Sequence, residues 1–149
     1  MLFKRFNRDQ VEQVFTVMEN NEGATINKDQ AVQIDNTTDV DGIKMRDMDT
    51  GALYAFAGIA DRDIASGGFG PVQVYGYRST AKVFQTDTSQ ASGIPLVPVA
   101  GQDYLQSAAS TIASNAAVTL QPFFAALMES IDTAGASAAA SVKVFIRAM

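Results

Sequence analysis

Hydrophobic and polar residues alternate along much of the chain with the period of two that is typical of β-strands. The clearest case is residues 71–77, where two valines and Gly76 fall on one face and Gln73 falls with two tyrosines on the other. A glycine inside such a pattern favours a bend, as at the corners of β-barrels, so we expect one near Gly76. The predicted strand then continues through residues 80–84.

Shorter stretches predict further strands at residues 31–34, 43–48, 52–60 and 142–147. Residues 52–60 (ALYAFAGIA) are apolar throughout, and a glycine-rich loop follows them. Residues 94–98 contain two prolines. Because proline cannot donate to a strand ladder, we expect any strand there to lie at the edge of a sheet.

Two segments fit a helix as well as a strand. Residues 9–20 carry hydrophobic residues at the helical spacing i, i+3, i+4, i+7, but residues 14–17 fit a short strand equally well. Residues 122–132, from Pro122 to Asp132, contain good helix formers and a proline suited to the first turn of a helix. A strand is favoured there, because the strand predicted at residues 142–147 needs a partner.

The last third of the sequence repeats the middle. Residues 124–131 align with residues 56–64 when one deletion is allowed, and residues 141–146 align with residues 71–76. Each copy predicts an apolar strand, a loop of small residues and a strand with period-two alternation. The two copies therefore predict two hairpins.

Together these elements predict an all-β, mainly antiparallel fold, a small β-barrel or sandwich, with one short helix as the alternative at residues 122–132. A chain of 149 residues favours one domain. We expect residues 1–22 to form an N-terminal arm that ends in a turn, and residues 23–149 to form the barrel domain.

Composition excludes several kinds of chemistry. The chain has no cysteine and no histidine, so disulfides, thiolate nucleophiles, Cys/His zinc sites and imidazole bases are ruled out. The formal charge of −5 argues against nucleic-acid binding, which needs a basic face. No apolar run approaches the length of a membrane span, and we expect no membrane association. Residues 64–149 hold as many bases as acids and are rich in Ala, Ser and Thr, which fits burial against other subunits and, equally, small residues in the long loops of a small β-domain.

Short motifs with a chemical meaning all have simpler interpretations. Residues 37–42 (TTDVDG) are similar to the start of a calcium loop, but Met48 stands where the closing Glu is required. Residues 67–70 (GGFG) precede a strand and lack the Lys-Ser/Thr of a phosphate loop. Residues 79–82 match S-x-x-K without the accompanying motifs. The aspartate pairs 39/41, 47/49 and 61/63 lie in polar turns. We therefore expect no enzyme activity, no metal and no cofactor.

The predicted arm combines basic and aromatic side chains in an otherwise acidic protein: Phe3, Lys4, Arg5, Phe6 and Arg8. Such an arm fits an acidic surface on a partner, and a frayed terminus is the alternative interpretation. These five residues are the candidate partner interface.

Three stretches in order carry a resemblance to a known family. They are residues 23–34 (GATINKDQAVQI), residues 57–68 with Ala-Gly-Ile-Ala followed by Asp-Ile-Ala-Ser-Gly-Gly, and residues 71–76 (PVQVYG). The chain resembles the small β-barrel decoration, or cement, proteins on the heads of tailed bacteriophages, over residues 23–84 and, through the repeat, residues 120–148. The resemblance implies a virion structural protein on the capsid surface, made in the host cytoplasm. Its implied partners are the major capsid protein and further copies of itself, a trimer among the options.

Two other functions fit the same sequence. A tail or head-tail connector component built on a similar barrel would occur in few copies per particle, because closed rings limit the number. A small carbohydrate-binding module belongs to a different class and would need exposed aromatic residues around a cleft. The available tyrosines are Tyr54, Tyr75, Tyr77 and Tyr104.

Overall fold

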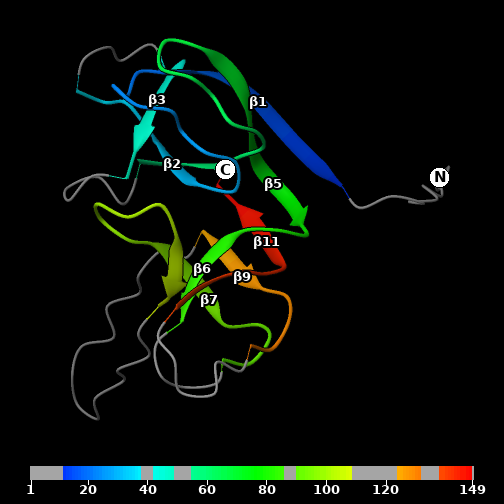
Figure 1. The fold of residues 1–149 in the computed structure, drawn as a ribbon. Helices are drawn as coiled ribbons and strands as arrows, with labels where there is room; N and C mark the ends of the chain where they lie inside the picture. Colours follow the sequence, from blue (N-terminus) through cyan, green and yellow to red (C-terminus); the bar gives the residue numbers. More distant parts are fainter. Residues whose placement is uncertain are drawn as a thin grey trace, which may run out of the picture.

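In a computed structural model of the protein, the secondary-structure elements of the described residues are β-strands (Figure 1). The structure describes residues 12–37, 42–48, 55–85, 90–108, 124–131 and 138–148. In chain order the strands are β1 (Gln13–Asn20), β2 (Ala31–Ile34), β3 (Lys44–Asp47), β4 (Phe56–Ala60), β5 (Phe69–Arg78), β6 (Lys82–Gln85), β7 (Pro95–Pro98), β8 (Leu105–Ser107), β9 (Ala125–Leu127), β10 (Ala138–Ser141) and β11 (Val144–Arg147). The prediction of an all-β, mainly antiparallel fold is confirmed.

The first five strands form a small closed barrel. Their order around the ring is β1-β3-β2-β4-β5, and β5 pairs again with β1, which closes the ring. All neighbours are antiparallel except β1 and β3, which are parallel. Figure 1 shows this barrel at the top of the molecule, with β1 and β5 running side by side.

The remaining strands repeat the arrangement of the first five. β7 pairs antiparallel with β8 and β9 as β2 does with β3 and β4, and β6 runs parallel to β8 as β1 does to β3. β9 pairs antiparallel with β11 as β4 does with β5. Isolated bridges join Ile26 to Ile64 and Gln90 to Ile131, at corresponding places in the two copies. The predicted repeat is confirmed, and it extends back to β1, so that β1–β5 corresponds to β6–β11.

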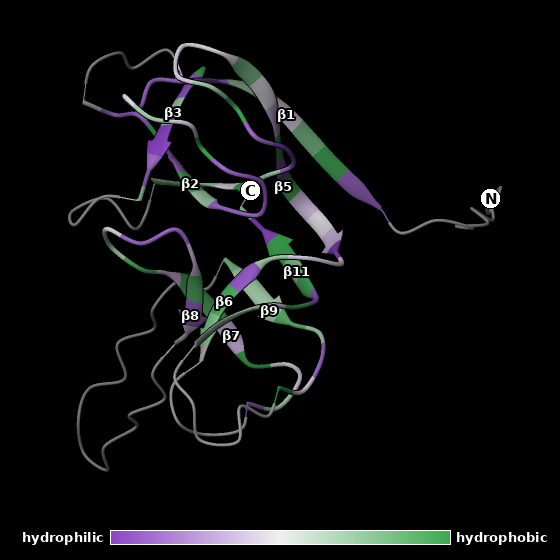
Figure 2. Ribbon diagram, in the orientation of Figure 1, coloured by the Kyte–Doolittle hydropathy of each residue, from purple (hydrophilic) through white to green (hydrophobic). Residues whose placement is uncertain are grey.

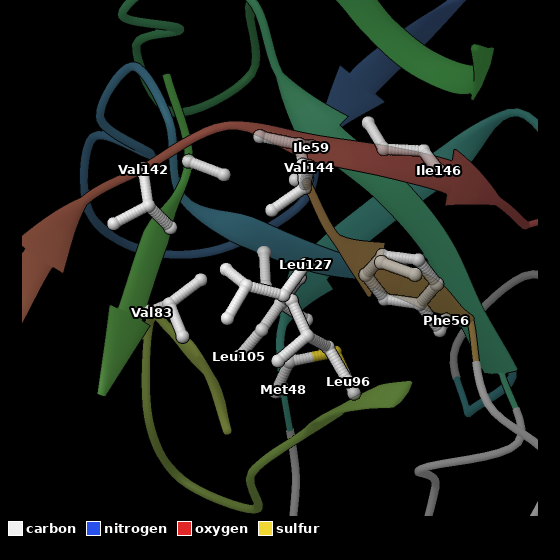
Figure 3. Packing of buried hydrophobic residues seen from close by; sticks show 13 residues of the cluster. Met48, Phe56, Ile59, Val83, Leu96, Leu105, Leu127, Val142, Val144 and Ile146 are labelled. Atoms are coloured by element: carbon white, nitrogen blue, oxygen red, sulfur yellow. The ribbon is translucent and has the colours of Figure 1, made fainter. Parts of the chain in front are cut away.

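Two hydrophobic clusters fill the two halves. The first contains Met18, Ile26, Val32, Met45, Ala57, Ala60, Ile64, Val72 and Val74. The second is larger, and Figure 3 shows side chains from β4, β6, β7, β8, β9 and β11 meeting in it. Its buried members are Ala31, Met48, Phe56, Ile59, Ala81, Val83, Leu96, Leu105, Ala125, Leu127, Val142, Val144 and Ile146.

Strand β4 lies between the two clusters, which explains why its sequence is apolar throughout. Ala57 and Ala60 belong to the first cluster, whereas Phe56 and Ile59 belong to the second. The spacing of three rather than two follows from a bulge opposite β2, where Gly58 has a φ of 150°. A Cβ on Gly58 would lie 2.2 Å from the carbonyl oxygen of Gln73, so only glycine fits.

Strand β5 joins the two halves and bends at Gly76, as the sequence predicted. Gly76 has a φ of 100° and pairs with Gln13 of β1 on one edge and with Ile146 of β11 on the other. A Cβ at this position would lie 1.9 Å from the carbonyl oxygen of Glu12. The bend and the close approach of β1 therefore both require glycine at position 76.

Near the beginning of the chain, the sequence allowed either a helix or a strand, and the structure shows the strand. Residues 13–20 form β1 and not a helix, and the buried Met18 and Asn20 anchor the strand in the first barrel. The second half of the segment predicted as an arm over residues 1–22 thus belongs to the sheet. Residues 1–11 lie outside the described residues.

In the second half, one prediction is confirmed and two are wrong. The strand favoured within residues 122–132 is present as β9. The expectation that a strand at residues 94–98 lies at a sheet edge is wrong, because β7 pairs with β8 and β9. Its prolines stand at the two ends of the strand, and the Pro95 carbonyl still accepts a hydrogen bond from Ala108 N–H. Part of the expected small-residue loop forms β10, which pairs with β6.

The substitution Gly76→Ala should destabilise the protein by about 3 kcal/mol or more, because it adds both backbone strain and a collision with the β1 backbone. Gly101→Ala is the matched control. Gly101 has a φ of 68°, but nothing lies within 4 Å of its added Cβ, so only strain of about 1–2 kcal/mol is expected. Chemical denaturation of both variants measures the difference. Equal losses would contradict the close approach of β1 to β5.

Candidate interaction surface

The residues proposed from sequence as a partner interface are not placed by the structure. Phe3, Lys4, Arg5, Phe6 and Arg8 all lie outside the described residues. The arm therefore stays a prediction. What the structure does provide is the strand into which the arm leads, β1, whose first residue is Gln13.

The short motifs that are similar to calcium-binding, phosphate-binding and serine-nucleophile sequences lie in turns and strands where the structure describes them. Gly67, with a φ of 71°, lies in the turn that leads into β5. Ser79 follows β5, and the Lys82 ammonium forms an ion pair with the Asp103 carboxylate. Residues 38–41 and Asp49 lie outside the described residues.

The aspartates at positions 61 and 63 bind to groups of the protein itself. Asp61 Oδ1 accepts a hydrogen bond of 3.0 Å from Arg78 Nη1. Asp63 Oδ1 accepts one of 2.8 Å from the Lys28 amide. The two carboxylates hold different loops and do not act as a pair.

A buried polar network surrounds the guanidinium of Arg78, which is only 4% exposed. Its Nε and Nη2 donate to Asp29 Oδ1 at 3.2 and 2.6 Å, and Nη2 also donates to the Ala60 carbonyl at 3.0 Å. Its Nη1 donates to Asp61 Oδ1 and, at 3.2 Å, to Gln73 Oε1. These bonds use all five guanidinium donors, so the group ties β5 to the end of β4 and to the turn before β2.

Gln73 extends this network across the bend in β5. Its Nε2 donates to the carbonyl oxygens of Tyr75 and Tyr77, at 3.3 and 3.0 Å, on either side of Gly76. The alternation of β5 placed Gln73 on the face opposite the valines without indicating its burial, and the structure shows that its side chain is fully buried. The sequence prediction missed this because the bend changes which carbonyls need a donor, and alternation alone does not reveal that.

A second polar group lies where β3 ends. Gln30 Nε2 donates to Asp47 Oδ1 at 2.7 Å. Partial burial raises the pKa of the Asp47 carboxyl above its ordinary value of 3.8, and the nearby negative charges of Glu22 and Asp103 raise it further, while Arg46 lowers it. Groups of three or more metal-ligating side chains are not found in the part of the chain that the structure describes.

The described surface carries an exposed apolar face formed by β1 and β5. Phe15 and Val17 of β1 are 43% and 64% exposed, and Phe69 of β5 is 57% exposed. Val17 lies opposite Pro71, and Phe69 lies opposite Glu19, so these side chains share one face of the β1–β5 pair. Figure 2 shows apolar positions along β1. We call Phe15, Val17, Phe69 and Pro71 the β1 face.

The sequence prediction did not identify the β1 face, although a signal was present. Residues 14–18 (VFTVM) place apolar side chains on both faces of a strand, but the burial of Met18 and the exposure of Val17 depend on the barrel. The sequence pattern places Phe69 only in a glycine-rich turn. Its exposure follows from its pairing with Glu19, a contact between residues far apart in sequence.

The tyrosines that a carbohydrate-binding module would need contact different elements. The Tyr75 ring packs edge-on against Phe145, with centroids 5.3 Å apart. The Tyr104 ring stacks on Phe84 at 5.0 Å, in the second half of the molecule. Tyr54 lies outside the described residues.

Comparison of the sequence with protein-family models and with curated proteins finds no match. Within the described residues, no helix has the length and apolar character needed to cross a membrane. The β1 face is therefore the candidate functional surface on geometric grounds alone.

Replacing Arg78 with lysine should cost roughly 3 kcal/mol of stability, because one ammonium cannot reach the four acceptors that the guanidinium fork contacts. The matched control is Arg62→Lys. Arg62 is exposed and makes one long hydrogen bond, of 3.3 Å, to the Phe69 carbonyl, so its replacement should change stability by less than about 0.5 kcal/mol. Urea unfolding checks both. Similar small losses would show that the Arg78 network does not hold the fold.

The substitution Asp47→Asn should remove part of the pH dependence of stability. Because the folded state holds the Asp47 proton more tightly than the unfolded state, the contribution of Asp47 to wild-type stability falls as the pH rises from about 3.8 through the raised pKa. Asparagine keeps an oxygen for Gln30 but does not titrate. The Tm of the variant relative to wild type should therefore increase over this pH interval and then level off. A difference that stays constant or reverses would contradict the raised pKa.

Proposed function

We propose that this protein is a structural protein that binds to a larger protein shell, and specifically that it decorates the capsid of a tailed bacteriophage. The single observation that carries the binding role is the exposed β1 face. Phe15, Val17 and Phe69 form it together on two adjacent strands. The assignment to a phage capsid rests on the resemblance of residues 23–84 to decoration proteins.

The β1 face has the chemistry of a protein-binding surface. Single exposed hydrophobic residues are ordinary, but neighbouring ones on two paired strands mark an interaction site, since their exposure costs free energy until a partner covers them. Aromatic residues are enriched at the centres of such interfaces. Phe15 and Phe69 would supply those anchors.

Charge supports binding to the outside of a shell. The chain carries a formal charge of −5, which favours a location away from packed nucleic acid. The basic arm that precedes β1, with Lys4, Arg5 and Arg8, would then contact acidic groups on the shell next to the β1 face. A protein that binds the assembled shell and not its free subunits stabilises the shell by mass action.

Co-sedimentation tests this function directly. The full chain is mixed with assembled capsids of the phage that carries its gene and, separately, with the unassembled major capsid protein. We expect binding to the capsids and not to the free subunits. Phe69→Ser should weaken capsid binding by about tenfold or more, because it removes an aromatic anchor. Deletion of residues 1–11 should also weaken binding, because it removes the basic arm that contacts the shell.

Met128→Ser is the matched control for the β1 face. Met128 is 47% exposed and follows β9 in the second half, so its replacement removes a similar apolar side chain elsewhere. It should leave capsid binding unchanged, and both variants should keep the wild-type Tm. Equal binding to shells and subunits, or equal effects of the two substitutions, would contradict the proposal.

A further inference from the structure

Among the described residues, strand β1 is paired along only one of its edges over most of its length. β5 pairs with it from Gln13 to Glu19, whereas β3 joins the opposite edge only at Glu19 and Asn20. Within the described residues, no strand pairs with the other edge of residues 13–18. An edge of this kind presents backbone donors and acceptors to which another strand can bind.

The hydrogen bonds at the end of β1 show which residues point toward this open edge. The Glu19 amide donates to the Ile43 carbonyl of the β3 side at 2.9 Å, while the Asn20 amide donates to the Gly68 carbonyl of the β5 side at 2.8 Å. Because these directions alternate along an antiparallel strand, the amide and carbonyl groups of Phe15 and Val17 point to the open edge. Those of Thr16 and Met18 point to β5.

The internal repeat shows that the position equivalent to the beginning of β1 can have a strand paired to each of its two edges. β1 corresponds to β6, and three residues, 79–81, separate β6 from the end of β5. The end of β5 is therefore the counterpart of the beginning of β1. At Gly76 it has β1 on one edge and β11 on the other, both antiparallel. In the first copy, β5 lies on one edge, and no strand of the described part of the chain lies on the other.

We propose that this place is taken by β1 of a second copy of the chain, in an antiparallel pair around a two-fold axis. The sequence of β1 is self-complementary when Thr16 faces itself. Phe15 then lies opposite the partner's Val17 in a hydrogen-bonded pair, and this pair occurs twice because of the symmetry. An aromatic residue opposite a β-branched one is a favourable cross-strand pair.

The charges of β1 also fit this register. The pairing spans residues 14–18 of both copies, which carry no charged side chain, and it ends before Glu19, where β3 already occupies this edge. The β1 faces of the two copies lie on the same side of the joined sheet, because residues that pair across strands share a face. The dimer therefore carries one continuous apolar surface in place of two separate ones. The pairing does not depend on what that surface binds.

The mass of the full chain in solution tests the pairing without any capsid. Sedimentation over a range of concentrations should show a reversible dimer of the 15.8 kDa chain. Val17→Pro removes an amide that points to the open edge and leaves the bonds to β5 in place. It should weaken the dimer by about tenfold or more, since the symmetry removes two hydrogen bonds. Val17→Ala keeps the amide and should retain the dimer.

Cysteine cross-linking tests the register, because the chain has no cysteine of its own. Thr16→Cys should form a disulfide-linked dimer on mild oxidation, since facing residues at a non-hydrogen-bonded position lie within disulfide reach. Ser92→Cys is the matched control, because Ser92 is exposed in the turn before β7, and it should stay largely unlinked.

Three results would overturn the proposal. One is a monomer at every concentration up to the millimolar range. A second is a dimer that Val17→Pro does not weaken while the Tm and the circular dichroism spectrum of the variant remain those of the wild type. A third is a chain that dimerises only after residues 1–11 are deleted, which would mean that the arm, and not a second copy, covers β1.

Discussion

The fold depends on the bend of β5 at Gly76. At this residue β5 leaves the first barrel and enters the second half while β1 and β11 pair with its two edges. Gln73 donates to the carbonyls on either side of the bend, and the buried Arg78 binds Gln73, Asp29 and Asp61. Glycine permits the bend, and the polar network fixes its direction. Both halves of the molecule are thus positioned by one strand.

The sequence predicts the period-two elements well, because hydrophobic alternation reports burial on one face of a strand. Residues 71–77 and 142–147 were identified in this way, and their similarity revealed the repeat. Features that depend on tertiary pairing were missed. Gln73 and Arg78 read as ordinary polar residues of a strand, yet both are buried. Proline content placed residues 94–98 at an edge, but a strand with prolines only at its ends can lie inside a sheet.

The candidate surface was predictable only in part. The sequence drew attention to the basic and aromatic arm, whereas the structure draws attention to the strand that follows it. Phe15 and Val17 become significant because β5 holds them on an outward face beside Phe69. The same strand presents backbone groups at an open edge. One element therefore offers an apolar face and an edge, two distinct ways of binding other proteins.

Hydrogen–deuterium exchange at single amides of β1 tests this account most directly. In the dilute chain, the amides of Thr16 and Met18 should be protected by β5, whereas those of Phe15 and Val17 should exchange rapidly. Raising the protein concentration until β1 is covered should then slow Phe15 and Val17 selectively. Protection of Phe15 and Val17 that is already complete in the dilute monomer would contradict the open edge on which the account rests.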